Sequence, residues 1–269
     1  MQQAIAILDS GVGGLTVVKE VMRQLPQEKI IYFGDTARTP YGPRDAEEVK
    51  LFTNQIVDYL IQFQPKMIVI ACNTATAVAL DDIRNRLDIP VLGVISPGAR
   101  AAIKSTRSGI VGVIGTDGTI RSNAYELALK TISPTIQVHS QACPQLVPLV
   151  EQGIYNSPEA LETVRESLSP LLNKPIDCLI LGCTHYPFLT QAITEVVSPD
   201  VTLLSSADET AREVSTILYH QGMLASADEV PVHQFFCSGD AEIFHKITES
   251  WLHEQLSGML VVWQVPTFI

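Results

Sequence analysis

The sequence has no long uninterrupted apolar run, although 46% of its 269 residues are hydrophobic. The longest candidate, Met67 to Leu80, is broken by Asn73 and Thr74 and falls short of the ~18 apolar residues that a membrane span requires. The amino terminus has no basic segment before its apolar run, and Asp9 cuts that run short, so a secretory signal is not expected. These absences predict a protein of the cytoplasm without a membrane partner.

Basic side chains are scarce. The chain has 18 Lys and Arg residues against 29 Asp and Glu residues, which gives a formal net charge of −11. Nucleic-acid binding depends on clustered Lys and Arg against phosphates, and the sequence contains no such cluster. We therefore expect no nucleic-acid partner.

The cysteines lack the C-x-x-C spacing that is typical of zinc sites and of disulfide exchange. Their number is odd and they are spread over the chain, so we expect free thiols and no metal centre. The five are Cys72, Cys143, Cys178, Cys183 and Cys237.

Apolar, β-branched runs recur along the chain and have the continuous pattern of strands that are buried on both faces of a parallel sheet. One intervening segment, Asp45 to Phe63, has apolar residues at three- or four-residue intervals and predicts a helix that ends before Pro65. This alternation indicates an α/β fold with mainly parallel sheets. The predicted strands are Ala4 to Leu8, Ile30 to Phe33, Met67 to Ala71, Val91 to Ile95, Ile110 to Ile114, Cys178 to Leu181 and Val201 to Leu204.

A weak internal repeat divides the chain into two related halves. The segment Met67 to Thr74 aligns with Cys178 to His185 at an offset of 111 residues. We predict one α/β domain from residues 1–96 plus 208–269 and a second from residues 97–207. In this arrangement the tail, with strand-like segments at Gln234 to Cys237 and Leu260 to Val265, returns to the first domain.

Cys72 and Cys183 occupy the same place in the two repeats, directly after a strand and before polar residues. Ligands of parallel α/β sheets bind outside the carboxyl ends of the strands. If the halves face each other across a cleft, two thiols approach one substrate from opposite sides, which suits proton removal and return. Cys143, Cys178 and Cys237 have no such placement and are interpreted as buried apolar residues.

Several residues near the strand ends are candidates to assist this chemistry. Asp9 ends the first strand, where it could reach Cys72 or cap a helix, and His185 titrates near neutrality two residues after Cys183. Glu151 alone has the pattern of a solvated helix residue. Side-chain donors and backbone N–H groups at helix starts could bind a carboxylate without arginine. The candidate ligand contacts are Ser10, Asn73, Thr74 and Thr184, with Tyr41 and Gly42 in a loop.

The sequence resembles the glutamate racemases of the aspartate/glutamate racemase family along its whole length. The resemblance rests on five motifs, which are Asp9 to Thr16, Tyr41-Gly42, Ala71 to Ala75, Glu151 to Gly153 and Gly182 to Pro187. It implies two pseudo-symmetric α/β domains with the active site in the cleft between them.

The resemblance also implies a role for each site residue. In a two-base mechanism Cys72 and Cys183 act on opposite faces of the substrate's α carbon, Asp9 assists Cys72, and His185 with Glu151 assists Cys183. The implied substrate contacts are Asp9, Ser10, Tyr41, Gly42, Asn73, Thr74, Thr184 and His185. The family further implies glutamate as the small-molecule substrate, no cofactor or metal, a homodimer, and D-glutamate supply for peptidoglycan.

Two other functions remain compatible with the residues alone. One cysteine could act as a covalent nucleophile in acyl or amide hydrolysis, which would leave a trappable acyl-enzyme. Alternatively, the two halves could close on an acidic amino acid without reacting, in which case one enantiomer would keep its optical rotation.

Overall fold

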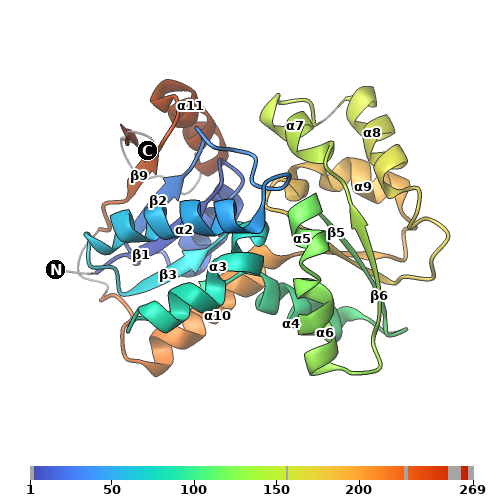
Figure 1. The fold of residues 1–269 in the computed structure, drawn as a ribbon, viewed down its shortest axis with the longest axis horizontal. Coiled ribbons are helices and arrows are strands. Elements are labelled where there is room, and N and C mark those ends of the chain that lie inside the picture. The colour runs from blue at the N-terminus through green and yellow to red at the C-terminus, as the bar shows by residue number, and fades with distance from the viewer. Residues whose placement is uncertain (1–2, 156, 227–229, 254–261, 266–269) are drawn as a thin grey trace.

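The fold consists of two parallel sheets, each covered by helices (Figure 1). It was obtained as a computed structural model that describes residues 3–155, 157–226, 230–253 and 262–265. Every strand pair in both sheets is parallel, which confirms the predicted α/β class. The first sheet contains β1 (Ile5–Asp9), β2 (Ile30–Gly34), β3 (Met67–Ile70), β4 (Val91–Gly93), β9 (Gln234–Cys237) and β10 (Val262–Gln264). The second contains β5 (Ile110–Gly115), β6 (Gln137–Ala142), β7 (Cys178–Gly182) and β8 (Thr202–Ser205).

The strand orders show the internal repeat. The first sheet has the order β10-β9-β2-β1-β3-β4, and the second has the order β6-β5-β7-β8. The four strands β2-β1-β3-β4 thus correspond one for one to β6-β5-β7-β8. The strands β3 and β7 occupy equivalent positions in the two sheets. Cys72 and Cys183, which follow these strands, therefore lie at equivalent edges of the two sheets.

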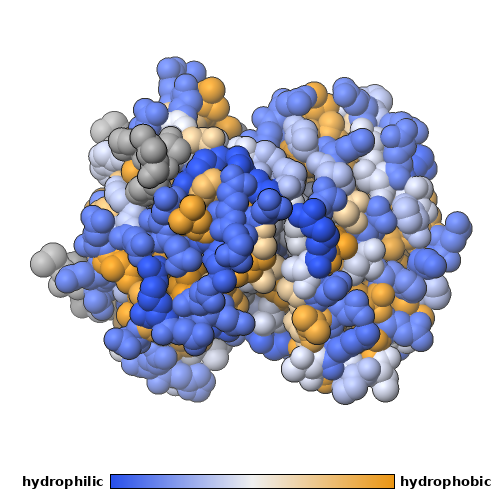
Figure 2. Space-filling model, in the orientation of Figure 1, coloured by the Kyte–Doolittle hydropathy of each residue, from blue (hydrophilic) through white to orange (hydrophobic). Residues whose placement is uncertain are grey.

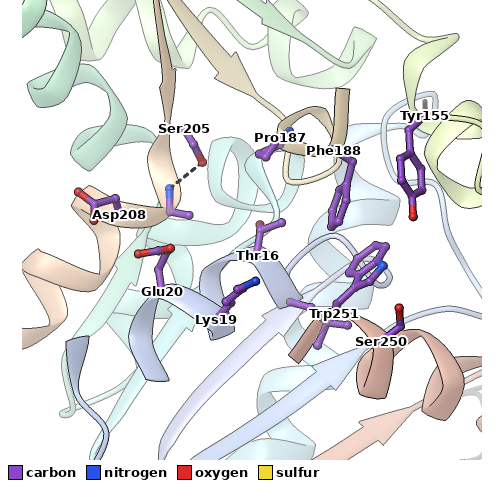
Figure 3. A pocket seen from close by; sticks show the side chains of 12 residues that line it. Thr16, Lys19, Glu20, Tyr155, Pro187, Phe188, Ser205, Asp208, Ser250 and Trp251 are labelled. Carbon is purple, nitrogen blue, oxygen red and sulfur yellow. Dashed lines mark hydrogen bonds between the residues drawn. The ribbon is translucent and has the colours of Figure 1, made fainter. Parts of the chain in front are cut away.

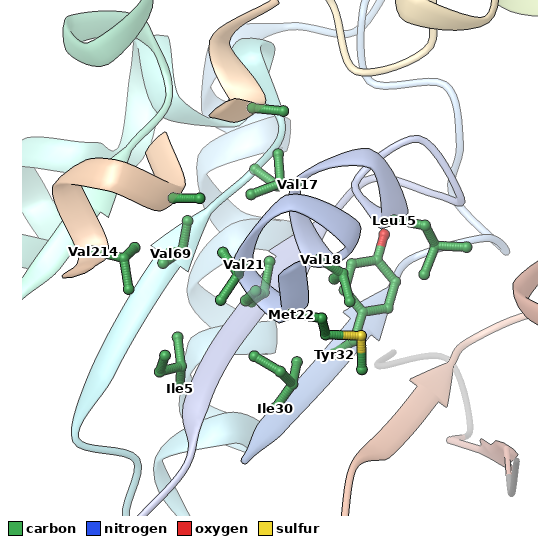
Figure 4. Packing of buried hydrophobic residues seen from close by; sticks show 14 of the residues in the cluster. Ile5, Leu15, Val17, Val18, Val21, Met22, Ile30, Tyr32, Val69 and Val214 are labelled. Carbon is green, nitrogen blue, oxygen red and sulfur yellow. The ribbon is translucent and has the colours of Figure 1, made fainter. Parts of the chain in front are cut away.

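The central strand β1 is buried on both faces, and alternate side chains enter different cores. Ile5 and Ile7 pack in one core against α1 (Leu15–Gln24), α10 (Ser206–His220) and α11 (Ala241–Leu252), as Figure 4 shows for part of this cluster. Ala6 and Leu8 pack in the other against α2 (Ala46–Ile61) and α3 (Asn73–Arg86). Burial of this area drives the layered packing.

The second sheet is covered in the same way. One face packs on α4 (Ile95–Ser105) and α6 (Ala124–Ile132). The other face packs on a layer of helices, one of which ends at the predicted site residue Glu151. That layer contains α7 (Leu146–Glu151), α8 (Pro158–Leu168), the 3-10 helix η1 (Tyr186–Leu189) and α9 (Thr190–Val196), and the short helix α5 (Asp117–Arg121) follows β5. We call each sheet with its covering helices the first and the second lobe.

Several predicted element boundaries were wrong. The strand expected at Val91 to Ile95 ends at Gly93, because Ile95 already begins α4. The strand expected to reach Ala71 ends at Ile70, where the chain turns into α3. Strand β6 was missed because it lies at a sheet edge and is partly exposed, so it lacks a continuous apolar run.

The predicted tail strand Gln234 to Cys237 is β9, whereas the last predicted strand is too long, because β10 ends at Gln264 and Val265 lies outside it. β9 pairs with β2, and β10 pairs with β9, so both extend the first sheet. Residues 260–261 of the last predicted strand lie outside the described residues. The exact domain boundaries at residues 96 and 208 stay a prediction.

The two lobes face each other across a furrow with strongly hydrophilic side chains on both rims (Figure 2). Trp251 of α11 packs against the cores of both lobes, and its ring centroid lies 3.9 Å from that of Phe188 in η1. This aromatic contact joins the returning tail to the second lobe. Among the described residues, no helix is long and apolar enough to cross a membrane.

Candidate active site

Both repeat cysteines line one small cavity of about 20 Å³ between the lobes. Cys72 follows β3 of the first sheet and Cys183 follows β7 of the second, so the thiols enter from opposite lobes. The volume has room for about one water molecule. The cavity lining is Ser10, Thr39, Pro40, Tyr41, Gly42, Cys72, Asn73, Thr74, Thr116, Val147, Gly182, Cys183, Thr184 and His185.

Cys72 caps the amino terminus of α3. Its Sγ accepts a hydrogen bond from the Ala75 N–H at 3.4 Å, and only 5% of the residue is exposed. Burial, with a smaller contribution from the nearby Asp9 charge, raises the pKa of the Cys72 thiol to about 12. At neutral pH this side chain is therefore a thiol, ready to donate a proton.

Asp9 ends β1, the strand beside β3, and its carboxylate is fully buried. Oδ1 accepts from the Gly11 N–H at 3.0 Å, and Oδ2 accepts from the Thr184 hydroxyl of the other lobe at 3.2 Å. Burial raises the pKa of Asp9 above its ordinary value, which makes it a stronger base than a solvated aspartate. The residue does not cap α1, because Gly14 occupies that position.

Cys183, His185 and Glu151 form a chain of contacts in the second lobe. The Cys183 Sγ lies 3.7 Å from His185 Nδ1, and His185 Nε2 lies 2.6 Å from Glu151 Oε1. Burial by itself lowers the pKa of His185, but the contacts with Cys183 and Glu151 outweigh it and raise the pKa to about 10. An imidazolium is therefore held between a carboxylate and the sulfur.

All the predicted site residues line this cavity except Asp9 and Glu151, which lie behind it and contact Thr184 and His185. Asn73 Oδ1 accepts from the Tyr125 hydroxyl at 2.7 Å, whereas the buried Asn73 Nδ2 has no protein partner among the described residues. The Thr74 hydroxyl lies 2.9 Å from that of Thr116 and 3.2 Å from that of Thr119. The unused amide donor and this hydroxyl cluster can bind an anionic oxygen.

Five cavity residues were not among the predicted site residues, namely Thr39, Pro40, Thr116, Val147 and Gly182. Thr116 follows β5, the neighbour of β7, so its place at a strand end was the available signal. Thr39 precedes the Tyr41-Gly42 motif, and its buried Oγ1 has no partner among the described residues. Val147 lies on α7, one turn before the predicted Glu151, but as an apolar helix residue it has no chemical signal of its own.

Gly13 explains the glycine-rich turn that follows β1. A Cβ atom at this position would lie 2.4 Å from Thr184 Oγ1 and 2.6 Å from His185 Nδ1. Only glycine allows the turn of the first lobe to approach these second-lobe side chains so closely. The turn therefore serves close packing of the two lobes around the site.

A larger cavity of about 570 Å³ lies apart from the cysteines (Figure 3). Its wall includes Thr16 and Lys19 of α1, together with Tyr155, Phe188 and Trp251. Its lining contains neither the two thiols nor the residues that assist them. We therefore place the reaction centre in the smaller cavity. Within the described parts of the chain, no group of three or more His, Cys, Asp or Glu residues is placed to hold a metal ion.

The raised pKa of His185 predicts that stability falls as pH rises from about 6.5 to about 10. Below about pH 6.5 both the folded and the unfolded chain bind the His185 proton, and the contribution of this residue to stability is complete. At higher pH the unfolded chain loses the proton first, and the contribution decreases until it is lost near pH 10. Urea denaturation between about pH 7 and 8.5 measures this slope. His185→Asn should flatten it, and equal slopes in both proteins would contradict the prediction.

Comparisons with known proteins agree on one family. A family model described as Asp/Glu/Hydantoin racemase matches residues 10–214. A glutamate racemase from Oceanobacillus iheyensis is 55% identical over 265 residues, which cover 98% of this chain and 97% of that protein.

Solved structures give the same result. A glutamate racemase isoform from Bacillus anthracis superposes with a TM-score of 0.93 at 50% identity, covering 98% of this chain and 97% of that one. A Francisella tularensis glutamate racemase, solved with D-glutamate, superposes with a TM-score of 0.90 at 35% identity and the same coverage. The chain therefore belongs to the Asp/Glu/Hydantoin racemase family.

Proposed function

We propose that the protein is a glutamate racemase that interconverts L- and D-glutamate with Cys72 and Cys183 as its two bases. The observation that carries this proposal is the cavity shared by two thiols from opposite lobes. The names of its relatives, and the D-glutamate bound to the Francisella tularensis protein, support glutamate as the substrate.

The two thiols differ in their surroundings, and the mechanism uses that difference. The His185 imidazolium stabilises a thiolate on Cys183, which removes the α proton from one face of the substrate. Cys72, held as a thiol, donates its proton to the other face. In the reverse direction Asp9 accepts the Cys72 proton, and its raised pKa makes it suited to that task.

The α proton is a weak acid, so the developing negative charge needs fixed donors. Asn73, Thr74 and Thr184 line the cavity, and the buried Asn73 Nδ2 and the Thr74 hydroxyl can donate to the substrate's carboxylates, as can the Thr184 hydroxyl once its bond to Asp9 breaks. Such donors lower the barrier most when the lobes close on the substrate and exclude bulk water. The chemistry proposed here requires no cofactor or metal.

Glutamate is far larger than the cavity, so substrate entry requires the lobes to part. The bonds that must break include the one from Gly118 N–H to the Gly42 carbonyl at 2.8 Å and the Asp9 to Thr184 contact. A groove of about 250 Å³ adjoins the cavity at Thr74 and is lined by Arg44 and Arg121. Arg44 is paired with Glu48 at 2.7 Å and Asp45 also lines the groove, so the guanidinium that attracts a dicarboxylate despite the net charge of −11 is that of Arg121.

The wider role follows from the product. D-glutamate supply for peptidoglycan would place the enzyme in the cytoplasm, and the family resemblance suggests a homodimer. We retain the two-domain division at residues 96 and 208 as part of this proposal, with the active site between the domains.

Incubation of purified protein with L-glutamate in D2O tests the function. We expect the sample to become an equal mixture of enantiomers, with deuterium at the α carbon of the newly formed enantiomer, and activity to survive EDTA and hydroxylamine. L-aspartate is the parallel substrate control. Binding of glutamate with no loss of optical rotation would overturn the proposal, as would a persistent acyl-enzyme mass.

A further inference from the structure

A second buried carboxylate, Asp35, lies directly after β2 and does not line the cavity. It is fully buried and accepts hydrogen bonds from three side chains. Arg38 Nε donates at 2.7 Å, the Ser238 hydroxyl donates at 2.6 Å, and the Tyr41 hydroxyl donates to the same oxygen as Arg38. A buried charge is costly unless it is fully paired, so this network is a specific arrangement.

Arg38 fixes the network on the rest of the first lobe. Its Nη1 donates to Gln55 Oε1 of α2 at 2.6 Å, and its guanidinium lies 4.1 Å from the centre of the Phe52 ring. The Tyr41 ring also packs on Phe52, with centroids 5.8 Å apart. The side chains of Arg38 and Tyr41 therefore fix the loop between β2 and α2 both to Asp35 and to α2.

The other side of this loop forms part of the cavity. Gly42 lies so close to Thr116 that an added Cβ would come within 2.6 Å of it, and the Gly42 carbonyl accepts from Gly118 of the second lobe. Tyr41 and Gly42 both line the cavity. A small shift of the loop would thus change both the substrate contacts and the fit of the lobes.

We infer that Asp35 is a positioning residue for the racemase site, which acts through Tyr41 to hold the Tyr41-Gly42 backbone against the substrate. This inference rests on the proposed function. Ser238 follows β9, so its hydrogen bond to the Asp35 carboxylate connects the returning tail to the loop between β2 and α2. Asp35 contacts neither thiol and moves no proton itself.

Asp35→Asn is the principal test. The amide keeps the size of the side chain but replaces one acceptor oxygen by a donor, which faces the donors of Arg38, Tyr41 or Ser238. We expect kcat/KM for glutamate to fall by about 10²-fold, mostly through a higher KM, because the loop is displaced. The pH profile of kcat should keep its shape, since Cys72, Cys183 and His185 are unchanged.

Glu28 provides a matched control at the other end of β2. It is also buried, it pairs with Lys66 Nζ at 2.5 Å, and it accepts from the Ala225 N–H at 2.8 Å. Glu28→Gln should reduce the free energy of unfolding but leave KM unchanged. If it raises KM as much as Asp35→Asn does, the effect is merely one of stability and the inference is overturned.

Tyr41→Phe makes the test independent of the folding of Asp35→Asn. It keeps the ring and removes the hydroxyl, so it should raise KM about 10-fold, and the double variant should lose no more than Asp35→Asn alone. Additive losses would overturn the proposed route through Tyr41, as would an unchanged KM in either single variant. An inactive wild-type protein would instead refute the proposed function.

Discussion

Replacement of either Cys72 or Cys183 by serine is expected to lower kcat/KM for glutamate racemisation by about 10²- to 10⁴-fold. The serine hydroxyl occupies nearly the same place but is a far weaker acid than a thiol, so it neither removes nor returns the α proton efficiently. Both variants should fold, because each changes one buried atom. Chiral chromatography of timed samples gives the rates in both directions.

Isotope exchange distinguishes a two-base site from a site with one base. In D2O each single variant retains one thiol, so it should exchange the α proton of only one enantiomer, and the two variants should show opposite preferences. Cys143→Ser is the control, because Cys143 is buried in the second lobe's core and does not line the cavity. Loss of exchange from the same enantiomer in both variants would contradict the two-sided arrangement.

His185→Asn should lower kcat/KM by about 10²-fold or more, because it removes the charged group beside Cys183. The wild-type reaction requires the protonated imidazole, so its rate should fall as pH passes upward through about 10. The variant has no such group and should lose that limb of the profile. Stopped assays from about pH 7 to 10.5 measure both effects.

Two further variants provide controls for this result. Glu151→Gln keeps the imidazole but removes the carboxylate 2.6 Å from Nε2, so we expect a smaller loss and a lower apparent pKa. His220→Asn changes an exposed histidine on α10 and should have no effect. A high-pH limb that persists in His185→Asn would assign it to another group.

The sequence predicted the features that depend on local pattern. Strands β1, β3 and β7 are buried on both faces, so continuous apolar runs marked them, and the strand ends marked Asp9, Cys72 and Cys183. The chemistry followed because parallel strands place such residues at one edge. The repeat also indicated that two such edges exist.

Other features depend on contacts between distant segments and have no local signal. Asp35 has the pattern of an ordinary turn residue, yet its partners come from the adjoining loop and from Ser238 in the tail. Glu151 has the pattern of a solvated helix residue, and its contact with His185 arises only from the packing of α7 against η1. The size of the cavity depends on how the lobes meet, which no single segment specifies.

The contact between Trp251 and Phe188 gives the protein a built-in optical reporter. The chain has only two tryptophans, and the other, Trp263, is 42% exposed on β10. With Trp263 replaced by phenylalanine, all indole emission would come from the seam where the tail meets the second lobe. Separation of the lobes would then change the colour and intensity of that emission without an added dye.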